Sequence, residues 1–260
     1  MRFSIHPAAW AILFCGCTLV VHGEEISYAA ITAISEHRAV DGTRRGVEDV
    51  LRENGYLTGK ALKLRYQCAQ GSPATAAQIA KMLAEERPTV VVAISTPSAQ
   101  TMAAAIRTVP IVFASVTDPV AARLITNWSA SGTNVTGVSD AVALEEQICF
   151  LEKLCPGLRA IGLLYNPSEV NSTLVLKEMG RLLGARQIRL VPAPVQRPAD
   201  IPLAVRSLKG KVDLIYTPTD NTIGSAYESL AKAADECRIP AITADPELVP
   251  RGAAAALGTS

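Results

Sequence analysis

The segment of residues 89–120 constrains the fold of this chain most, because its pattern predicts two buried strands joined by a helix. Residues 90–94 are an unbroken apolar run rich in valine, and residues 110–116 are a second, largely apolar run. Such runs are typical of strands that are covered on both faces. Between them, Thr96 is suited to cap a helix and Pro97 to occupy its first position. The segment therefore predicts a β-α-β unit with parallel strands.

Small polar side chains follow both of these predicted strands. They are Ser95, Thr96 and Ser98 after the first strand, and Ser115, Thr117 and Asp118 after the second. In open parallel sheets, ligands bind beyond the carboxyl ends of the strands. The free N–H groups and the dipole of the helix start suit an anion such as a carboxylate, and Asp118 suits a cation. The residues alone leave open the alternative that these hydroxyl groups only cap helices.

The alternation of strands and helices continues on both sides of this unit. Further strands are expected over residues 26–34, 61–66, 134–139, 160–165, 188–191 and 212–216. Further helices are expected up to about Asn54, over residues 73–86, 144–154, 198–208 and 222–237, and after Asn166, with Asn166 as cap and Pro167 first. Short apolar strands alternating with helices are typical of an α/β protein with parallel sheets.

The pattern restarts after residue 139, which predicts two lobes with similar organisation. We expect a first lobe over residues 24–138, a second lobe over 139–240, and a return of residues 241–260 to the first lobe. Closure would bury a ligand between two walls, formed by Thr96, Ser98, Thr117 and Asp118 on one side and by Asn166, Asp220 and Asn221 on the other. Asp220 has the alternative of merely capping the helix that follows it.

The amino terminus predicts export through a cleaved signal peptide. Arg2 precedes an apolar stretch over residues 8–21, which is short for a membrane span, and the small residues before Glu24 suit cleavage. A lipoprotein cleaved before Cys17 is the less favoured alternative. Without Arg2, the chain retains 24 basic residues against 24 acidic ones. This balance argues against nucleic acid or a membrane surface as a partner, and no later apolar run is long enough for a membrane span.

The predicted mature chain has few residues suited to catalysis. It has one histidine, His37, which argues against histidine metal sites and most catalytic triads. The chain has no GxSxG, GxxxxGK[ST] or CxxC motif and no GxGxxG after the first strand. We therefore expect reversible binding without catalytic residues, metal or cofactor. His37 follows the first strand and is placed at the cleft, although it could be an ordinary loop residue.

The predicted mature chain retains four cysteines. They are Cys68, Cys149, Cys155 and Cys237. Export would permit disulfides, but a chain of this size does not need them, and we expect at least two free thiols.

Eight segments between residues 42 and 258 carry a family resemblance. They read GTRRGVEDVLRENGY, AQGSPATAAQIAKML, AISTPSAQ, PIVFASVTDPV, NVTGVSD, IGLLYNPSEVNS, VDLIYTPTDNTI and IPAITADPELVPRGA. Together they resemble the exported substrate-binding proteins of ABC transporters that include tryptophan- and tyrosine-type binders. The resemblance implies the two-lobed type I periplasmic-binding-protein fold. It also implies a periplasmic receptor that captures an aromatic amino acid or similar small molecule and delivers it to a membrane permease driven by an ATPase.

The same resemblance implies ligand-binding residues in both lobes. These are Thr96, Ser98, Ser115, Thr117 and Asp118 in the first lobe, and Tyr165, Asn166, Thr217, Asp220 and Asn221 in the second. An amino-acid ligand would place its carboxylate at the helix start and its ammonium at Asp118 or Asp220. His37 is followed by Arg38, where the family usually has proline, which could alter the pocket floor.

Other interpretations of the sequence remain open. One is a periplasmic sensing domain that partners a membrane kinase, and another is an exported enzyme that uses Asp118 and Asp220 as acid and base. The family usually continues beyond residues 256–258 with a helix that completes the first lobe, whereas this chain stops at Ser260. We therefore expect either a truncated chain or a short variant in which one face of the first sheet is uncovered.

Overall fold

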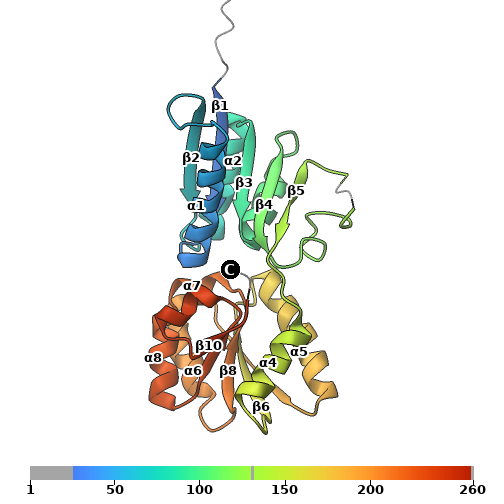
Figure 1. The fold of residues 1–260 in the computed structure, drawn as a ribbon, viewed down its shortest axis with the longest axis vertical. Helices are drawn as coiled ribbons and strands as arrows, with labels where there is room; N and C mark the ends of the chain where they lie inside the picture. Colours follow the sequence, from blue (N-terminus) through green and yellow to red (C-terminus); the bar gives the residue numbers. More distant parts are fainter. Residues whose placement is uncertain (1–25, 130–131, 259–260) are drawn as a thin grey trace, which may run out of the picture.

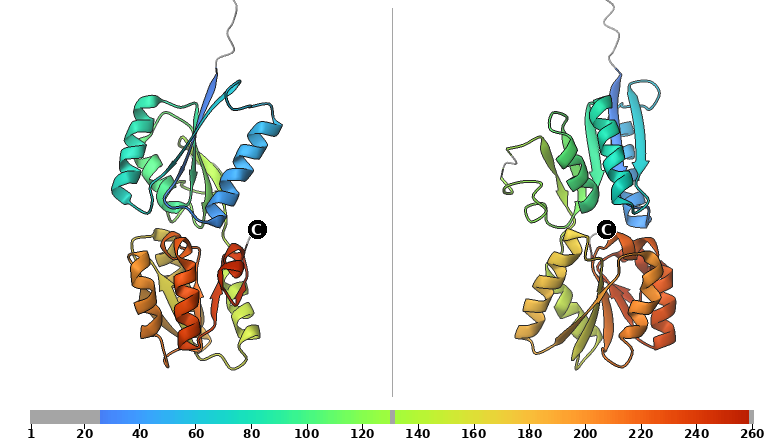
Figure 2. Two further views of the ribbon diagram at one scale, coloured as in Figure 1. Left: turned by 90° about the vertical axis from the view of Figure 1, so that its left-hand side faces the viewer. Right: turned by 180° about the vertical axis from the view of Figure 1, so that it is seen from behind.

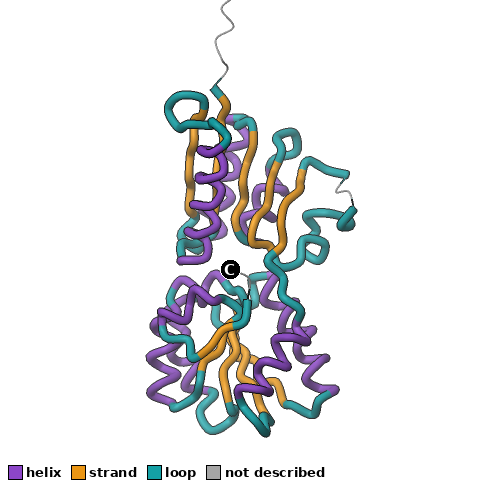
Figure 3. Tube along the Cα trace, viewed as in Figure 1, coloured by secondary structure: helices purple, strands orange, loops and turns teal. Residues whose placement is uncertain are grey.

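The computed structural model describes residues 26–129 and 132–258, which form two lobes stacked end to end (Figure 1). Each lobe has a central sheet with helices on both faces (Figure 3). The predicted signal peptide and the alternative lipid-attachment site at Cys17 lie outside the described residues. Among the described residues, no helix combines the length and apolar character needed to cross a bilayer.

The first lobe is built on a five-stranded parallel sheet. Its strands are β1 (Ser27–Ala33), β2 (Leu62–Cys68), β3 (Val90–Ile94), β4 (Ile111–Val116) and β5 (Val135–Ser139), in the order β2-β1-β3-β4-β5. Helix α1 (Arg38–Glu53) covers one face, and α2 (Pro73–Glu86) and α3 (Thr96–Ala105) cover the other (Figure 2). The core on the α2 and α3 side contains Leu83, Met102 and Phe113. On the α1 side, Val138 of β5 is 70% exposed, whereas Ile31 of β1 is buried.

The second lobe repeats this plan with a second parallel sheet. Its strands are β6 (Ala160–Tyr165), β7 (Arg189–Pro194), β8 (Leu214–Thr217), β9 (Ala241–Thr243) and β10 (Ala255–Ala256), in the order β10-β9-β8-β6-β7. Helices α4 (Leu144–Leu154) and α5 (Val170–Ala185) pack on one face, and α6 (Ile201–Ser207), α7 (Asn221–Ser225) and α8 (Tyr227–Cys237) on the other. Short 3-10 helices cover Pro198–Asp200 and Pro246–Arg251. Counted within each lobe, the strand order is the same, which confirms the predicted two-lobed α/β fold.

Two predicted helix starts are displaced in the structure. Ser95, and not Thr96, is the N-cap of α3, because its carbonyl accepts the Ala99 N–H at 3.0 Å. Asn166 is not the cap of α5, which begins at Val170 with Glu169 as N-cap. The Asn166 side chain instead accepts the Ser168 N–H at 2.8 Å, and this tight turn delays the helix by three residues.

The structure also corrects the end of the chain. The single helix predicted over residues 222–237 is two helices, because Ala226 has φ −134° and interrupts the helical hydrogen bonds. Residues 241–258 do not return to the first sheet, because β9 pairs with β8 and β10 pairs with β9 in the second sheet. Thr243 stands opposite Thr217 in this register. Both added strands are too short to give a strong pattern in the sequence.

The four cysteines of the described chain are unpaired. Cys237 is buried, Cys149 is exposed, and the other two are half-buried. Each lobe is held together by apolar clusters on both faces of its sheet.

Candidate functional site: a cavity between the lobes

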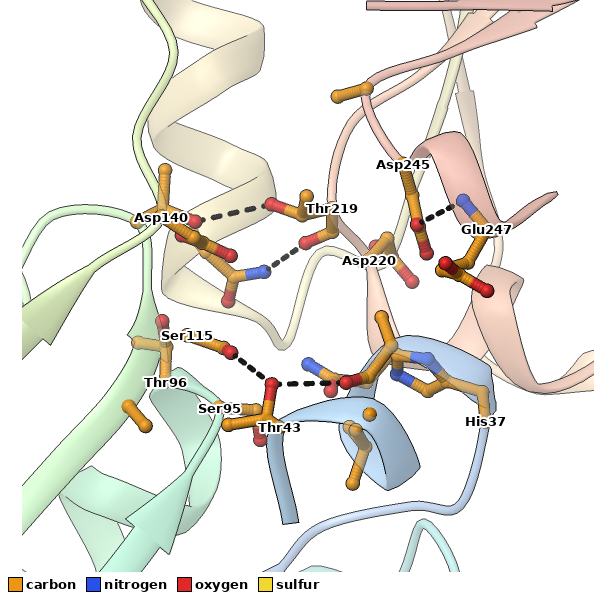
Figure 4. Close-up of a pocket in the computed structure, with 18 of the residues that line it drawn as sticks. His37, Thr43, Ser95, Thr96, Ser115, Asp140, Thr219, Asp220, Asp245 and Glu247 are labelled. Atoms are coloured by element: carbon orange, nitrogen blue, oxygen red, sulfur yellow. Dashed lines mark hydrogen bonds between the residues drawn. The ribbon is translucent and has the colours of Figure 1, made fainter. Parts of the chain in front are cut away.

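A cavity of about 570 Å³ lies between the two lobes, where the carboxyl ends of both sets of strands meet. Its wall combines the start of α1, the loops after β3, β4 and β5, and the loops after β8 and β9. Figure 4 shows Asp140, Thr96 and Ser115 at one end and His37, Asp245 and Glu247 at the other. We call these the Asp140 end and the His37 end.

Two strained serines form the first-lobe wall near the Asp140 end. Ser95 after β3 has φ 79° and ψ 154°, a backbone region that is nearly restricted to glycine, and Ser115 in β4 has φ 54°. Ser95 is only 4% exposed, and its Oγ has no hydrogen-bond partner among the described residues. Ser95 directly precedes the free N–H groups at the start of α3. Its hydroxyl and these N–H groups therefore belong to the same part of the cavity wall.

Thr43 of α1 orients the second serine. The Thr43 hydroxyl donates to the Ala39 carbonyl at 3.0 Å, and the Thr43 and Ser115 hydroxyl oxygens are 3.0 Å apart (Figure 4). Since the Thr43 proton is already used, Ser115 donates to Thr43. A lone pair of the Ser115 hydroxyl is then left for a further donor.

Two acceptor oxygens without partners stand at the Asp140 end. Asn171 of α5 is 3% exposed, and its amide donates to the Thr219 carbonyl at 2.7 Å, which leaves Oδ1 without a partner among the described residues. Asp140 begins the link between the lobes, and its Oδ1 is likewise buried without a partner. Burial raises the pKa of Asp140 above its ordinary value. Unsatisfied buried acceptors are costly, so both oxygens favour a ligand that donates hydrogen bonds.

The His37 end contains an imidazole and a buried carboxylate. Neither ring nitrogen of His37 makes a hydrogen bond with the described residues, and burial lowers its pKa, which favours the neutral ring. Asp245 is 8% exposed and accepts the Glu247 N–H at 2.9 Å, and burial raises its pKa. At the rim, Arg38 of the first lobe pairs with Glu247 of the second at 3.2 Å.

Two buried carboxylates hold the start of α7 rather than facing the cavity freely. Asp220 accepts hydrogen bonds from the Asn166 N–H, the Ser172 hydroxyl and the Ile223 N–H at 2.7, 2.6 and 2.9 Å. Glu169 accepts the N–H groups of Asn221 and Thr222, both at 3.1 Å. Burial, and then the charge of Glu169, raise the pKa of Asp220 to about 7. Asp220 therefore acts as a helix cap, the alternative that the sequence left open.

The predicted ligand residues divide into two groups. The cavity is lined by His37, Thr96, Ser115, Thr117, Asp220 and Asn221. The other predicted residues, which are absent from this lining, are Ser98, Asp118, Tyr165, Asn166 and Thr217. Contact of either group with a ligand stays a prediction.

Local structure explains why the second group lies away from the cavity. The Ser98 hydroxyl is 2.8 Å from that of Thr32 in β1. Asp118 closes its own turn by accepting the N–H groups of Val120 and Ala121 at 3.0 and 2.9 Å. Thr217 is buried at the end of β8, and Tyr165 packs against the second-lobe core. These side chains are thus used inside one lobe.

Several lining residues were missed as ligand candidates by the sequence interpretation. They are Thr43, Asp140, Asn171, Thr219 and Asp245. Asp140 directly follows β5, so the rule of strand ends could have found it. Thr43 lies inside α1, where nothing in the sequence distinguishes it. Within the described ranges, no group of three or more His, Cys, Asp and Glu side chains could hold a metal ion.

Comparison with known proteins identifies related sequences. The profile of one family, described as ABC transporter substrate binding protein, matches residues 28–260. A curated protein named tyrosine-binding protein, from Clostridioides difficile (strain R20291), is 33% identical over 228 residues, which make up 88% of this chain and 66% of that protein. The chain thus spans just under two thirds of the length of this relative.

Solved structures share the fold and superpose on this chain to different degrees. A conserved domain protein from Vibrio cholerae is 39% identical with a TM-score of 0.86, covering 88% of this chain and 77% of that one. An ABC domain from Streptococcus pneumonia in complex with L-Trp is 29% identical with a TM-score of 0.84, covering 87% and 77%. The ligand-free, open structure of CD0873 from Clostridium difficile is 35% identical and covers 88% and 77%, yet its TM-score is 0.61. This chain therefore superposes better on the tryptophan-bound structure than on the open one.

Proposed function

Because the chain belongs to the ABC transporter substrate-binding protein family, we propose that it captures an amino acid or a similar small zwitterion between its lobes and delivers it to a permease. The observation that carries this proposal is the set of buried polar atoms without partners at the Asp140 end: Ser95 Oγ, Asp140 Oδ1 and Asn171 Oδ1. A site with a helix start on one wall and acceptor oxygens on the other matches both charges of a zwitterion. The proposed place of action is the periplasm, in line with the predicted signal peptide.

The ligand carboxylate is proposed to bind the first-lobe wall. Ser95 and the start of α3 line this part of the cavity, where the Ser95 hydroxyl and the free N–H groups of the helix are the available donors. A helix start stabilises a negative charge through its free N–H groups and its dipole. The strained backbone of Ser95 supports this role, because such strain is concentrated at binding sites.

The ligand ammonium is proposed to bind Asp140 and Asn171. The sequence favoured Asp118 or Asp220 for this role, but the carboxylates of both are occupied by backbone N–H groups. Asp140 retains a buried oxygen without a partner, and Asn171 Oδ1 offers a second acceptor. A charge-assisted hydrogen bond to the ammonium would satisfy Asp140 and compensate for its burial.

Closure of the lobes supports capture rather than catalysis. The hydroxyls of Thr117 in the first lobe and Thr219 in the second are 3.2 Å apart beside the Asp140 end (Figure 4). The arrangement of the lobes is similar to that of the relative that holds L-Trp. The family match favours this function over a sensing domain and over an enzyme that uses Asp118 and Asp220.

A ligand screen with a matched pair of variants tests the proposal. The protein is stripped of bound ligand by unfolding and refolding, and thermal unfolding is then followed with each common amino acid. We expect at least one amino acid to raise the Tm, with a Kd measurable by calorimetry. Asp140→Asn should weaken that binding at least tenfold. Asp200→Asn, whose carboxylate pairs with Arg197 on the surface, should leave it unchanged. Absence of any stabilising amino acid, or equal binding by the two variants, would contradict the proposal.

A further inference from the structure

The His37 end of the cavity has a chemistry of its own. We propose that it receives the tip of the ligand side chain, and that this tip must donate a hydrogen bond, as a hydroxyl, amide or amine does. The protein would then select a polar-tipped amino acid over an apolar one of the same shape. This inference rests on the proposed function, which places the two charged groups of the ligand at the Asp140 end.

His37 is positioned to contact a ligand and not to stabilise a lobe through hydrogen bonds. It is the N-cap residue of α1, and its side chain makes no capping hydrogen bond. Its ring packs against α7 of the second lobe, 3.6 Å from the position a Cβ would take on Gly224. Asn221 lies beside the ring, but neither ring nitrogen reaches a protein partner among the described residues. A neutral imidazole can accept a hydrogen bond at one nitrogen and donate one at the other.

Asp245 supplies an acceptor with a negative charge beside this ring. Among the described residues, the hydrogen bond given to its carboxylate comes from the Glu247 N–H, so most of its acceptor capacity is unused. Two arginines lie near this end: the guanidinium of Arg251 is held by Glu228 and the Gly224 carbonyl, and that of Arg38 pairs with Glu247. The buried Asp245 carboxylate therefore lacks a direct ion-pair partner in the described chain, and a donor from the ligand would compensate for its burial.

The remaining lining does not offer an aromatic surface to the ligand. The aromatic side chains of the described residues lie outside the cavity: Phe113 in the first-lobe core, Tyr216 and Tyr227 in the second, and the others elsewhere. Apolar contact at this end comes from Val40, Ala244 and Leu248. An apolar tip would leave the ring nitrogens of His37 without partners and most of the acceptor capacity of Asp245 unused. A site built to hydrogen-bond a ligand group strongly rejects the analogue that lacks it.

Pairs of amino acids that differ only at the tip test this inference. Calorimetry on the stripped protein compares L-tyrosine with L-phenylalanine, L-threonine with L-valine, and L-lysine with L-norleucine. In the pair that binds most tightly, we expect the polar member to bind about 100-fold more tightly or better. Asp245→Asn and His37→Leu should each reduce this ratio by at least tenfold, mainly by weakening the polar member. The matched control Asp200→Asn should preserve the ratio.

The outcomes separate this inference from the proposed function. If the apolar member of the best pair binds as tightly as the polar one, the inference is wrong, while capture of amino acids stands. The inference is also wrong if the ratio of polar to apolar affinity is unchanged in both His37→Leu and Asp245→Asn. Two variants are used so that the test survives if one of them fails to fold. If no amino acid binds at all, the proposed function fails first.

Discussion

Single residues at the cavity combine a structural cost with a proposed binding role, and Ser95 shows this most directly. Its φ of 79° and ψ of 154° are strained for any side chain except glycine. Ser95→Gly should therefore raise the free energy of unfolding by about 1 kcal/mol, because glycine adopts this conformation freely. The same change should weaken ligand binding, since the buried hydroxyl is lost.

Chemical denaturation and calorimetry measure the two effects of Ser95→Gly separately. Ser95→Ala is the control, because it loses the hydroxyl but keeps the strain. It should weaken binding, and the strain is measured by the stability of Ser95→Gly in excess of that of Ser95→Ala, because both variants remove the hydroxyl that lacks a partner. A glycine variant that is less stable than the wild type would refute the strain argument.

Asp140 predicts an opposing pH dependence for stability and binding. Burial raises its pKa in the folded state above the ordinary 3.8, so the ionised carboxylate destabilises the ligand-free protein at neutral pH. This cost is lost as the pH falls through the raised pKa. Asp140→Asn should thus raise the Tm of the ligand-free protein at pH 7.5, with a gain that shrinks in acid.

Ligand binding by the wild type should weaken as the pH falls through the raised pKa of Asp140, because an ammonium prefers the ionised carboxylate. Calorimetric titrations over a pH series measure this loss. The Asn variant should bind more weakly at neutral pH and show a flatter profile. An unchanged pH profile in that variant would assign the titration to another group.

The sequence located the cavity better than it identified the atoms that face it. Parallel strand ends predict where a ligand lies, and Thr96, Ser115 and Thr117 do line the cavity. The position of a carboxylate after a strand does not reveal whether its oxygens face the cavity or accept the N–H groups of its own turn. Asp118 closes its turn, whereas Asp140 keeps a free oxygen, and this difference depends on the path of a few backbone atoms.

At the scale of the elements, the start of α7 depends on an acidic side chain from another part of the chain. Glu169 of the α5 start accepts the N–H groups of Asn221 and Thr222, which a helix of five residues cannot satisfy itself. Glu169→Ala should leave these donors buried and destabilise the protein by about 2 to 3 kcal/mol. The Tm should fall by about 4 to 12 °C, which thermal unfolding would measure.

Glu178→Ala is the control for this variant, because Glu178 pairs with Arg181 on the exposed face of the same helix. Its Tm should change by about 1 °C or less. If both variants unfold at the wild-type temperature, the cap of α7 does not matter for stability.

Elements with strong local signals were predicted closely. Helix α2 begins at Pro73 after Ser72, whose hydroxyl accepts the Thr75 N–H, and both of its ends were predicted correctly. The break between α7 and α8 was missed because Ala226 is a good helix former by itself. Tertiary contacts impose the break there, among them the hydrogen bond from Arg251 to the Gly224 carbonyl.

The whole molecule is held closed by few direct polar contacts between the lobes. These include the Thr117 and Thr219 hydroxyls at 3.2 Å, the Arg38 and Glu247 pair at 3.2 Å, and the Ser35 hydroxyl donating to the Asn221 carbonyl at 3.4 Å. A ligand that binds both walls adds contacts that exist only in the closed arrangement. Addition of ligand should therefore shift the population toward closure.

Small-angle scattering should record this closure as a decrease in the radius of gyration when ligand is added. Arg38→Ala should change the affinity by less than about fivefold. The side chains of Arg38 and Glu247 are 58% and 50% exposed, and an ion pair this exposed contributes little. A radius of gyration that does not respond to a bound ligand would contradict closure. A loss of affinity far beyond fivefold would mean that Arg38 contacts the ligand itself.

The repeated strand order also affects how the chain can fold. All five strands of the first sheet lie before Asp140, and all five of the second lie after Ala143, so neither sheet borrows a strand from the other half. When folding starts from the amino-terminal half, that half can complete its core without any strand of the second half. Damage to the second half, such as loss of Glu169, would then leave a folded first half behind instead of a wholly unfolded chain.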